Sequence, residues 1–94
     1  MALTFAWDPR KAAGNLRKHK LSFEEAATVF DDPMGTAVAD PDHSIDEDRF
    51  LIVGITARGK PVIVSFVEQG HRIRLISARQ LTTREREQYE ETKD

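Results

Sequence analysis

The fold of this chain is decided by residues 58–79, RGKPVIVSFVEQGHRIRLISAR. Two segments of this stretch, 61–68 and 72–78, are rich in β-branched and aromatic residues, as strands are. The residues between them, Gln69, Gly70 and His71, favour a tight turn, and a second turn at 58–61 precedes the first segment. The stretch therefore predicts two paired strands with basic residues at their edges.

Strict alternation assigns the side chains of these strands to faces, because successive residues of a strand point to opposite sides of the sheet. In the first strand, one face carries Val62, Val64, Phe66 and Glu68. In the second strand, one face carries Ile73, Leu75 and Ser77, joined by Arg79 if the strand extends that far, and the other carries Arg72, Arg74, Ile76 and Ala78. One apolar set therefore ends in a carboxylate and the other in a guanidinium. Such strand ends are natural places for a polar site, since the packed core stops there.

The remaining segments predict helices at both ends of the chain and further strands between them. A short edge strand at 4–7 precedes a helix over 9–19, which has an aspartate cap and a proline in its first turn. Ser22 and Glu25 form a capping box for a second helix that ends at 31–33. Weak strand character at 35–39 is followed by a central strand at 49–56, apolar on both faces. A second capping box, Thr82 with Glu85, introduces a charged helix over 83–91.

Length and composition indicate one small α+β domain over residues 1–94. In it, two N-terminal helices pack on a mainly antiparallel sheet of three to five strands, and a helix ends the chain. Cysteine is absent, which suits a reducing compartment. No segment approaches the ~20 apolar residues of a membrane span, and the N-terminus does not resemble a signal peptide. We therefore expect a cytoplasmic protein with no membrane partner.

The formal charge of −2 hides a strong asymmetry along the chain. Residues 1–20 carry five positive and one negative side chain, and residues 51–81 carry the same numbers, so each segment has a charge of +4. Residues 21–50 carry one positive and nine negative side chains, for −8, and residues 82–94 carry three and five, for −2. The first helix and the strand pair can form one anion-binding surface, because local potential matters more than the total. Charges dispersed over a solvated surface are the alternative.

An ordered set of motifs runs through nearly the whole chain. The motifs are Phe5-x-Trp7-Asp8-Pro9-x-Lys11, Asn15-x-x-Lys18-His19, Ser22-Phe23-Glu24-Glu25-Ala26, Phe30-x-Asp32-Pro33, Asp42-His43-Ser44, Glu47-x-Arg49, Gly54, and the ending Arg72-Ile73-Arg74-x-Ile76-Ser77-Ala78-Arg79 with Glu85-Arg86-x-x-Tyr89. Together they resemble the BrnT family of ribonuclease toxins, which are related in fold to the RelE toxins. One departure is Lys20, where the family commonly has glycine, so the first helix must close without glycine's freedom at positive φ.

This resemblance implies a compact RelE-like domain that cleaves RNA without a metal or another cofactor and suppresses translation. It also implies a BrnA-like antitoxin, whose DNA-binding domain lets the complex repress its own operon. Contact with operator DNA is then only indirect, and the toxin forms a dimer or a heterotetramer with its antitoxin.

Metal-independent cleavage needs a base for the 2′-hydroxyl proton, cations for the crowded phosphate and an acid for the departing 5′ oxygen. We expect Arg58, Glu68 and Arg79 to be catalytic, because arginine grips phosphate bidentately and Glu68 is the only acidic residue between Arg49 and Thr82. Arg72 and Arg74 are the alternates. The alternative is that Arg58 and Glu68 are ordinary turn residues and that Arg79 pairs with the last helix.

Further basic residues are candidates for binding the RNA backbone: Lys11, Lys18, Lys20, His71, Arg72 and Arg74. His19, spaced with Leu16 on the packed side of its helix, is interpreted as structural. Trp7 is assigned to the core, and Tyr89 is a candidate for stacking on a base. His43 with Asp40, Asp42 and Asp46 matches no standard metal-ligand spacing, so we expect an exposed acidic loop there.

Two other functions stay open from the sequence. One is a catalytically inactive RelE-like module that acts only through its protein partner, for which an apolar sheet edge and an exposed last helix would supply the interface. The other is nucleic-acid binding without chemistry.

Overall fold

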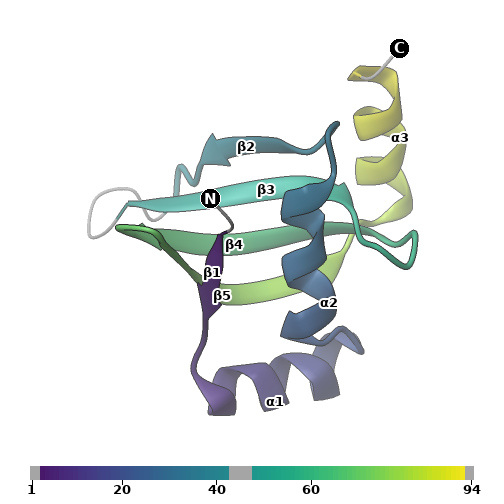
Figure 1. Cartoon of the computed structure of the whole chain (residues 1–94). Helices are drawn as coiled ribbons and strands as arrows, with labels where there is room; N and C mark the ends of the chain where they lie inside the picture. The colour runs from purple at the N-terminus through teal and green to yellow at the C-terminus, as the bar shows by residue number, and fades with distance from the viewer. Residues whose placement is uncertain (1–2, 43–47, 93–94) are drawn as a thin grey trace.

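The structure, a computed structural model, describes residues 3–42 and 48–92. Its elements are β1 (Thr4–Ala6), α1 (Pro9–His19), α2 (Phe23–Ala27), the 3₁₀ helix η1 (Thr28–Asp31), β2 (Thr36–Ala39), β3 (Arg49–Ile55), β4 (Pro61–Gln69), β5 (Arg72–Gln80) and α3 (Thr83–Thr92). The five strands form one sheet in the order β1-β5-β4-β3-β2. The pairs β2–β3, β3–β4 and β4–β5 are antiparallel, and β1 runs parallel to β5. This arrangement confirms the predicted α+β class (Figure 1).

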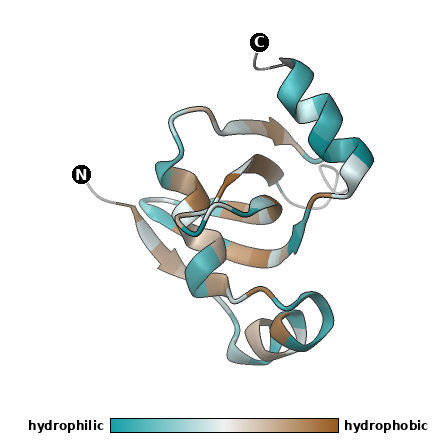
Figure 2. Cartoon of the chain, turned by 90° about the vertical axis from the view of Figure 1, so that its right-hand side faces the viewer, coloured by the Kyte–Doolittle hydropathy of each residue, from teal (hydrophilic) through white to brown (hydrophobic). Residues whose placement is uncertain are grey.

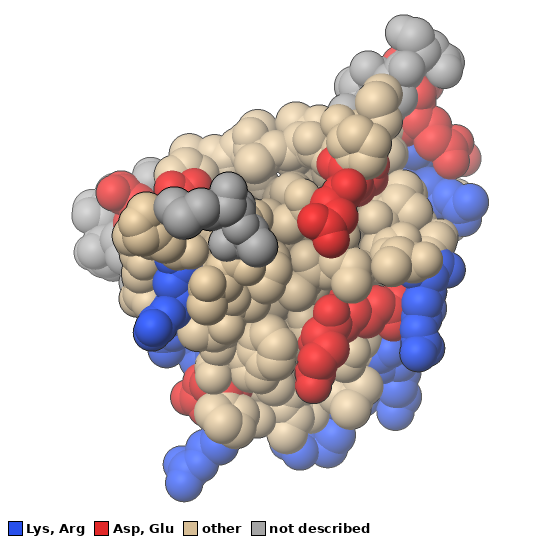
Figure 3. Space-filling model, viewed as in Figure 1, with Lys and Arg blue, Asp and Glu red and all other residues tan. Residues whose placement is uncertain are grey.

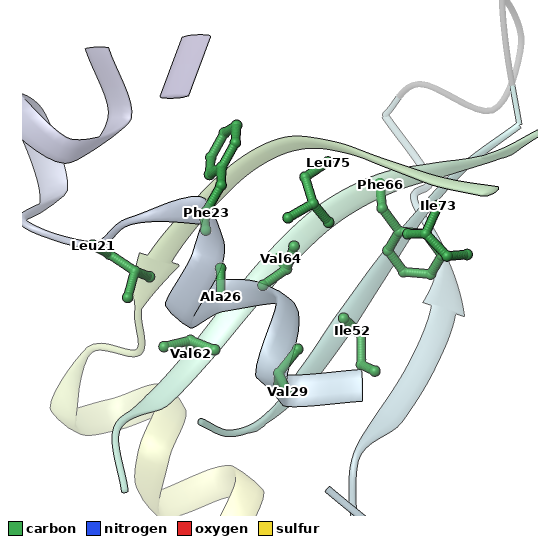
Figure 4. Close-up of a cluster of buried hydrophobic side chains, with 11 residues drawn as sticks. Leu21, Phe23, Ala26, Val29, Ile52, Val62, Val64, Phe66, Ile73 and Leu75 are labelled. Atoms are coloured by element: carbon green, nitrogen blue, oxygen red, sulfur yellow. The ribbon is translucent and has the colours of Figure 1, made fainter. Parts of the chain in front are cut away.

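One face of the sheet is covered by α2 and η1, and the core lies between them (Figure 4). Leu21, Phe23 and Val29 on the helical side are fully buried. They pack against residues of the three central strands, namely Ile52, Val62, Val64, Phe66, Ile73 and Leu75. Full burial of one such side chain contributes about 1.5–3 kcal/mol to the stability of the fold. The burial of this layer therefore supplies most of the favourable free energy of folding. Trp7 also packs here, with its ring centroid 5.8 Å from that of Phe23, as predicted.

The helices begin where the sequence predicts, and the two N-terminal helices lie against different parts of the sheet. Ser22 accepts a hydrogen bond from the Glu25 backbone N–H at 3.1 Å and so caps α2, which is only five residues long before η1 continues it. Helix α1 lies along the β5 edge of the sheet (Figure 1). The last helix, α3, is hydrophilic over most of its length and projects beyond the sheet (Figure 2).

A β-bulge in β5 overturns the strict alternation expected for that strand. Ser65 is paired with Ser77 but the next residue, Phe66, is paired with Leu75, so Ile76 is the extra residue. A bulge shifts the alternation by one. Ile73 and Leu75 therefore face the core, while Ser77 and Arg79 lie on the opposite face, and Ala78 turns inward and is 1% exposed. The predicted grouping of Arg79 with Ile73 and Leu75 is wrong for this reason.

No helix among residues 3–42 and 48–92 is long and apolar enough to cross a membrane.

Candidate active site

The face of the sheet opposite α2, called the open face below, carries polar and basic residues in register. Arg74, Val67 and Arg49 form one row across three strands. The next row contains Ser77, Ser65, Leu51 and Val38, and the one after it contains Arg79, Ile63, Val53 and Thr36. Rows on one face are roughly 7 Å apart, because residues on the same face are two positions apart and each residue advances the strand by about 3.4 Å. Arginines thus lie on both sides of the serine row.

A pocket of about 550 Å³, called the basic pocket below, opens on this face. Its floor is formed by strand residues, including Leu51, Ile63, Ser65 and Ser77. Its walls carry charged and titratable side chains from three parts of the chain: Lys18 and His19 from the end of α1, Arg79 from β5, and Asp40 and Asp42 after β2. Two cations, an imidazole and two carboxylates therefore meet in one depression.

Asn15 brings the end of α1 to this pocket. Its side chain is 7% exposed. Its Oδ1 accepts a hydrogen bond from the Ala78 backbone N–H at 3.0 Å, and its Nδ2 donates one to the Leu21 carbonyl at 3.0 Å. β1 pairs with β5 only as far as Arg74, so Asn15 takes the place of a neighbouring strand farther along β5. Lys18 and His19 follow one turn later and reach the open face.

Arg79 is held by the first turn of α3. Its Nη1 and Nη2 donate to the two oxygens of Glu85 at 2.8 and 3.0 Å. Glu85 also accepts from the Thr82 backbone N–H at 2.9 Å, and Thr82 Oγ1 accepts from the Glu85 N–H at 3.2 Å, which completes the predicted capping box. The hydrogen bond from Arg79, followed by that from the Thr82 backbone, lowers the pKa of Glu85 to about 2. The pair therefore stays ionised at neutral pH and fixes the direction of the guanidinium.

Two polar side chains in the basic pocket are buried. Asp40 is 6% exposed, and its Oδ1 accepts a hydrogen bond from the Asp42 backbone N–H at 3.0 Å. The expectation of an exposed acidic loop is therefore wrong for Asp40, whose backbone N–H donates to the Arg49 carbonyl at 2.8 Å and so holds the residue beside β3. Ser65 is 9% exposed, and its Oγ has no hydrogen-bond partner among the described residues. An unsatisfied buried hydroxyl costs free energy, and this one belongs to a residue that lines the basic pocket.

The structure does not bring Arg58, Glu68 and Arg79 together. Glu68 pairs with Ile73 and Arg79 pairs with Ile63, so the two positions are five residues apart along β4, which is roughly 17 Å of strand. Alternation also places Glu68 on the face that α2 covers. Arg58 lies in the turn after β3, and that turn is tied to η1 because the Ala57 N–H donates to Thr28 Oγ1 at 2.8 Å. Only Arg79 of the three lines the basic pocket.

The residues predicted to bind RNA lie in three places. Lys18 lines the basic pocket. Arg72 and Arg74 occupy the open face of β5, whereas the exposed His71 lies at the far turn of the strand pair and lines a separate depression with Arg72. Lys11 is exposed on α1. Lys20 is the C-cap of α1 with φ 57°, the positive φ that the sequence requires there, and its N–H donates to the Leu16 carbonyl.

Sequence reasoning missed His19, Asp40, Ser65 and Ser77 as residues of one pocket. The helical spacing of His19 with Leu16 predicts packing, but Leu16 is 49% exposed. The only sequence signal was the Lys18-His19 pair directly before the helix end. His43 and Asp46, considered as metal ligands with Asp40 and Asp42, lie outside the described residues.

Comparison with known proteins gives a matching family and similar solved structures. Residues 7–85 match the model of the family described as "Ribonuclease toxin, BrnT, of type II toxin-antitoxin system". The crystal structure of the Brucella abortus ribonuclease toxin BrnT superposes with a TM-score of 0.64 and 22% sequence identity, over 87% of this chain and 100% of that one. This likeness shows a common fold. No curated protein sequence matches the chain.

Proposed function

This chain belongs to the BrnT family of ribonuclease toxins of type II toxin–antitoxin systems, and on that basis we propose that it cleaves RNA in the basic pocket without a metal ion. The observation that carries the proposal is the meeting of the last turn of α1 with Arg79 of β5. That meeting supplies both kinds of group that the reaction needs, cations for the phosphate and side chains that transfer protons.

In the proposed reaction the 2′-hydroxyl attacks the adjacent phosphorus. The O2′–P bond forms and the P–O5′ bond breaks, which leaves a 2′,3′-cyclic phosphate and a free 5′-hydroxyl. Arg79 and Lys18 stabilise the charge on the phosphate oxygens. One proton leaves O2′ and another reaches O5′, and His19 and Asp40 are the pocket groups suited to these transfers because both can bind or release a proton. Glu85 is a positioning residue, since it orients Arg79.

We propose that this cleavage inhibits translation in the cytoplasm. Membership in a family of type II toxin–antitoxin systems implies a protein antitoxin. We propose that this partner is BrnA-like, that it covers the basic pocket, and that operator DNA is contacted only through it. The alternative function is an inactive module that acts through the antitoxin alone.

The test is cleavage of a mixed RNA by purified protein in buffer with EDTA. Wild type is compared with His19→Gln and Arg79→Lys, each shown to be folded, and with Glu68→Gln as a matched control on the other face of the sheet. We expect either pocket variant to lose about 100-fold in rate, as for the loss of a proton-transfer group or charge stabiliser, and Glu68→Gln to match wild type.

Each other outcome is informative. If Glu68→Gln loses activity while both pocket variants keep it, the site lies where the sequence predicted and not in the basic pocket. If wild type cleaves only without EDTA, a metal is required. If wild type does not cleave RNA under any condition, including with ribosomes added, the inactive module is the better description.

A further inference from the structure

A second pocket of about 550 Å³, called the α3 pocket below, adjoins the basic pocket on the open face. Aliphatic side chains of the strands form its floor and α3 forms its wall. It is lined by Thr36, Val38, Val53, Ile63, Leu81, Glu85, Gln88 and Tyr89. An apolar pocket with a few polar groups is the usual form of a small-molecule site.

The two pockets are adjacent. Ile63 lines both of them, and the ion pair of Arg79 with Glu85 stands at their boundary, because Arg79 lines the basic pocket and Glu85 the α3 pocket. Val53 and Ile63 lie in the same row of the sheet as Arg79. A polymer that binds Arg79 through one phosphate group therefore places the group next to that phosphate over the apolar floor of the α3 pocket.

The lining suits a flat group with apolar faces and polar edges. Val38, Val53 and Ile63 offer an aliphatic surface. Tyr89 is fixed beside it, since its hydroxyl donates to the Met34 carbonyl at 3.2 Å. Burial, and then the nearby Asp32 carboxylate, raise the pKa of Tyr89, so the phenol stays protonated and the ring stays in place. Gln88 offers both a hydrogen-bond donor and an acceptor. A purely aliphatic occupant would offer the Gln88 amide no hydrogen-bond partner, whereas a nucleobase offers both an apolar face and hydrogen-bonding edges.

We propose that the α3 pocket binds one unstacked nucleobase of the RNA, next to the phosphate that is cleaved in the basic pocket. This inference rests on the proposed function. In other single-stranded nucleic acid sites, stacking of one base on an aromatic side chain is worth about 5- to 150-fold in affinity, and Tyr89 is the aromatic residue that lines this pocket.

The test uses Val38→Trp, which fills the pocket from a side chain that is 53% exposed and outside the basic pocket. Val38→Ala is the matched control. Once the cleavage site in a mixed RNA is mapped, short oligonucleotides are made with the base present or removed on either side of that site. With wild type, removal of one of the two bases should lower kcat/KM about tenfold or more, chiefly through KM. Val38→Trp should lose the same factor on the intact oligonucleotide and nothing on the abasic one.

Binding of a non-cleavable 2′-O-methyl oligonucleotide, followed by methyl NMR of Val53 and Ile63, separates this proposal from the proposed function. Base-dependent shifts of these methyls, in a protein that does not cleave unmodified RNA, would uphold the pocket and overturn the ribonuclease. Cleavage that is insensitive to both base removals, or equal loss by Val38→Trp on both oligonucleotides, would overturn the pocket. The pocket proposal would also be overturned if Val38→Trp left RNA cleavage intact and instead prevented neutralisation by the antitoxin, because the α3 pocket would then bind a protein.

Discussion

At the scale of single residues, the site depends on side chains that hold backbone rather than touch substrate. Asn15 joins positions 63 residues apart by its bond to Ala78, and it also binds the loop after α1. One amide thus sets the distance between the end of α1 and β5. Loss of it would leave a buried N–H and a buried carbonyl unpaired, each of which costs roughly 1–3 kcal/mol.

Lys20 is the one non-glycine residue with positive φ in the part of the chain that the structure describes. A side chain in the left-handed region costs about 1–2 kcal/mol, which glycine avoids. We predict that Lys20→Gly raises the free energy of unfolding by about 1 kcal/mol, measured by urea denaturation. Lys20→Ala keeps the Cβ and removes the charge, so it should change stability little. An equal gain in both variants would assign the effect to charge.

At the scale of secondary-structure elements, close approaches fix how η1 lies on the sheet. Gly54 of β3 lies under η1, where a Cβ would come within 2.8 Å of Val29 Cγ2 and 3.0 Å of Asp32 Oδ2. Asp32 itself accepts a hydrogen bond from the Ile55 N–H at 2.7 Å. The bulge in β5 acts on the same scale, since it turns Arg79 onto the open face.

Two glycine substitutions should therefore have opposite signs. Gly54→Ala should lower the free energy of unfolding by roughly 1–3 kcal/mol through overpacking. Gly14→Ala, inside α1, should raise it by about 0.5–1 kcal/mol, because the new Cβ would meet only Arg17 Nη2, at 3.8 Å. Denaturation of the two variants beside wild type checks this, and a stable Gly54→Ala protein would mean that η1 can move away from β3.

The attachment of α3 should depend on pH. The pKa of Glu85 is lowered to about 2 from 4.5, so its contribution to stability is complete above about pH 4.5 and is lost as the pH falls toward 2. The side chains of Arg79 and Glu85 are 40% and 35% exposed, which limits that contribution to about 1 kcal/mol or less. Glu85→Gln should thus be less stable than wild type at pH 7, and the difference should shrink at pH 3. Glu87→Gln is the matched control, and a difference independent of pH would contradict the assignment.

At the scale of the whole molecule, the chain separates its charges despite a net charge of −2. On the helix-covered side, acidic side chains gather in the middle, and lysines and arginines lie along the edges (Figure 3). Arg49, Arg74 and Arg79 belong instead to the open face. An RNA strand is therefore expected to follow that face and to avoid the side that α2 covers.

Salt dependence of RNA binding measures this arrangement. For single strands, the slope of log K against log salt is about −0.7 per phosphate neutralised. Arg74→Ala should make the slope less negative by about 0.7, whereas Arg86→Ala should not change it, because Arg86 pairs with Glu90 on α3 at 3.4 Å. Fluorescence anisotropy with a labelled non-cleavable RNA gives both slopes. Equal changes in the two variants would indicate diffuse attraction without a defined path.

By itself the sequence determined the elements, their caps, the α+β class and the family, because periodicity, capping boxes and the αL position at Lys20 are local properties of the chain. It also predicted that Arg79 can pair with the last helix. Only the tertiary structure decided which side chains share a site. The bulge at Ile76 reversed the face of Arg79, and the bond between Asn15 and Ala78 brought His19 to it. Both depend on backbone pairing between distant segments, which leaves no periodic trace in the sequence. For the same reason the distance between Glu68 and Arg79 could not be predicted from their places in one strand pair.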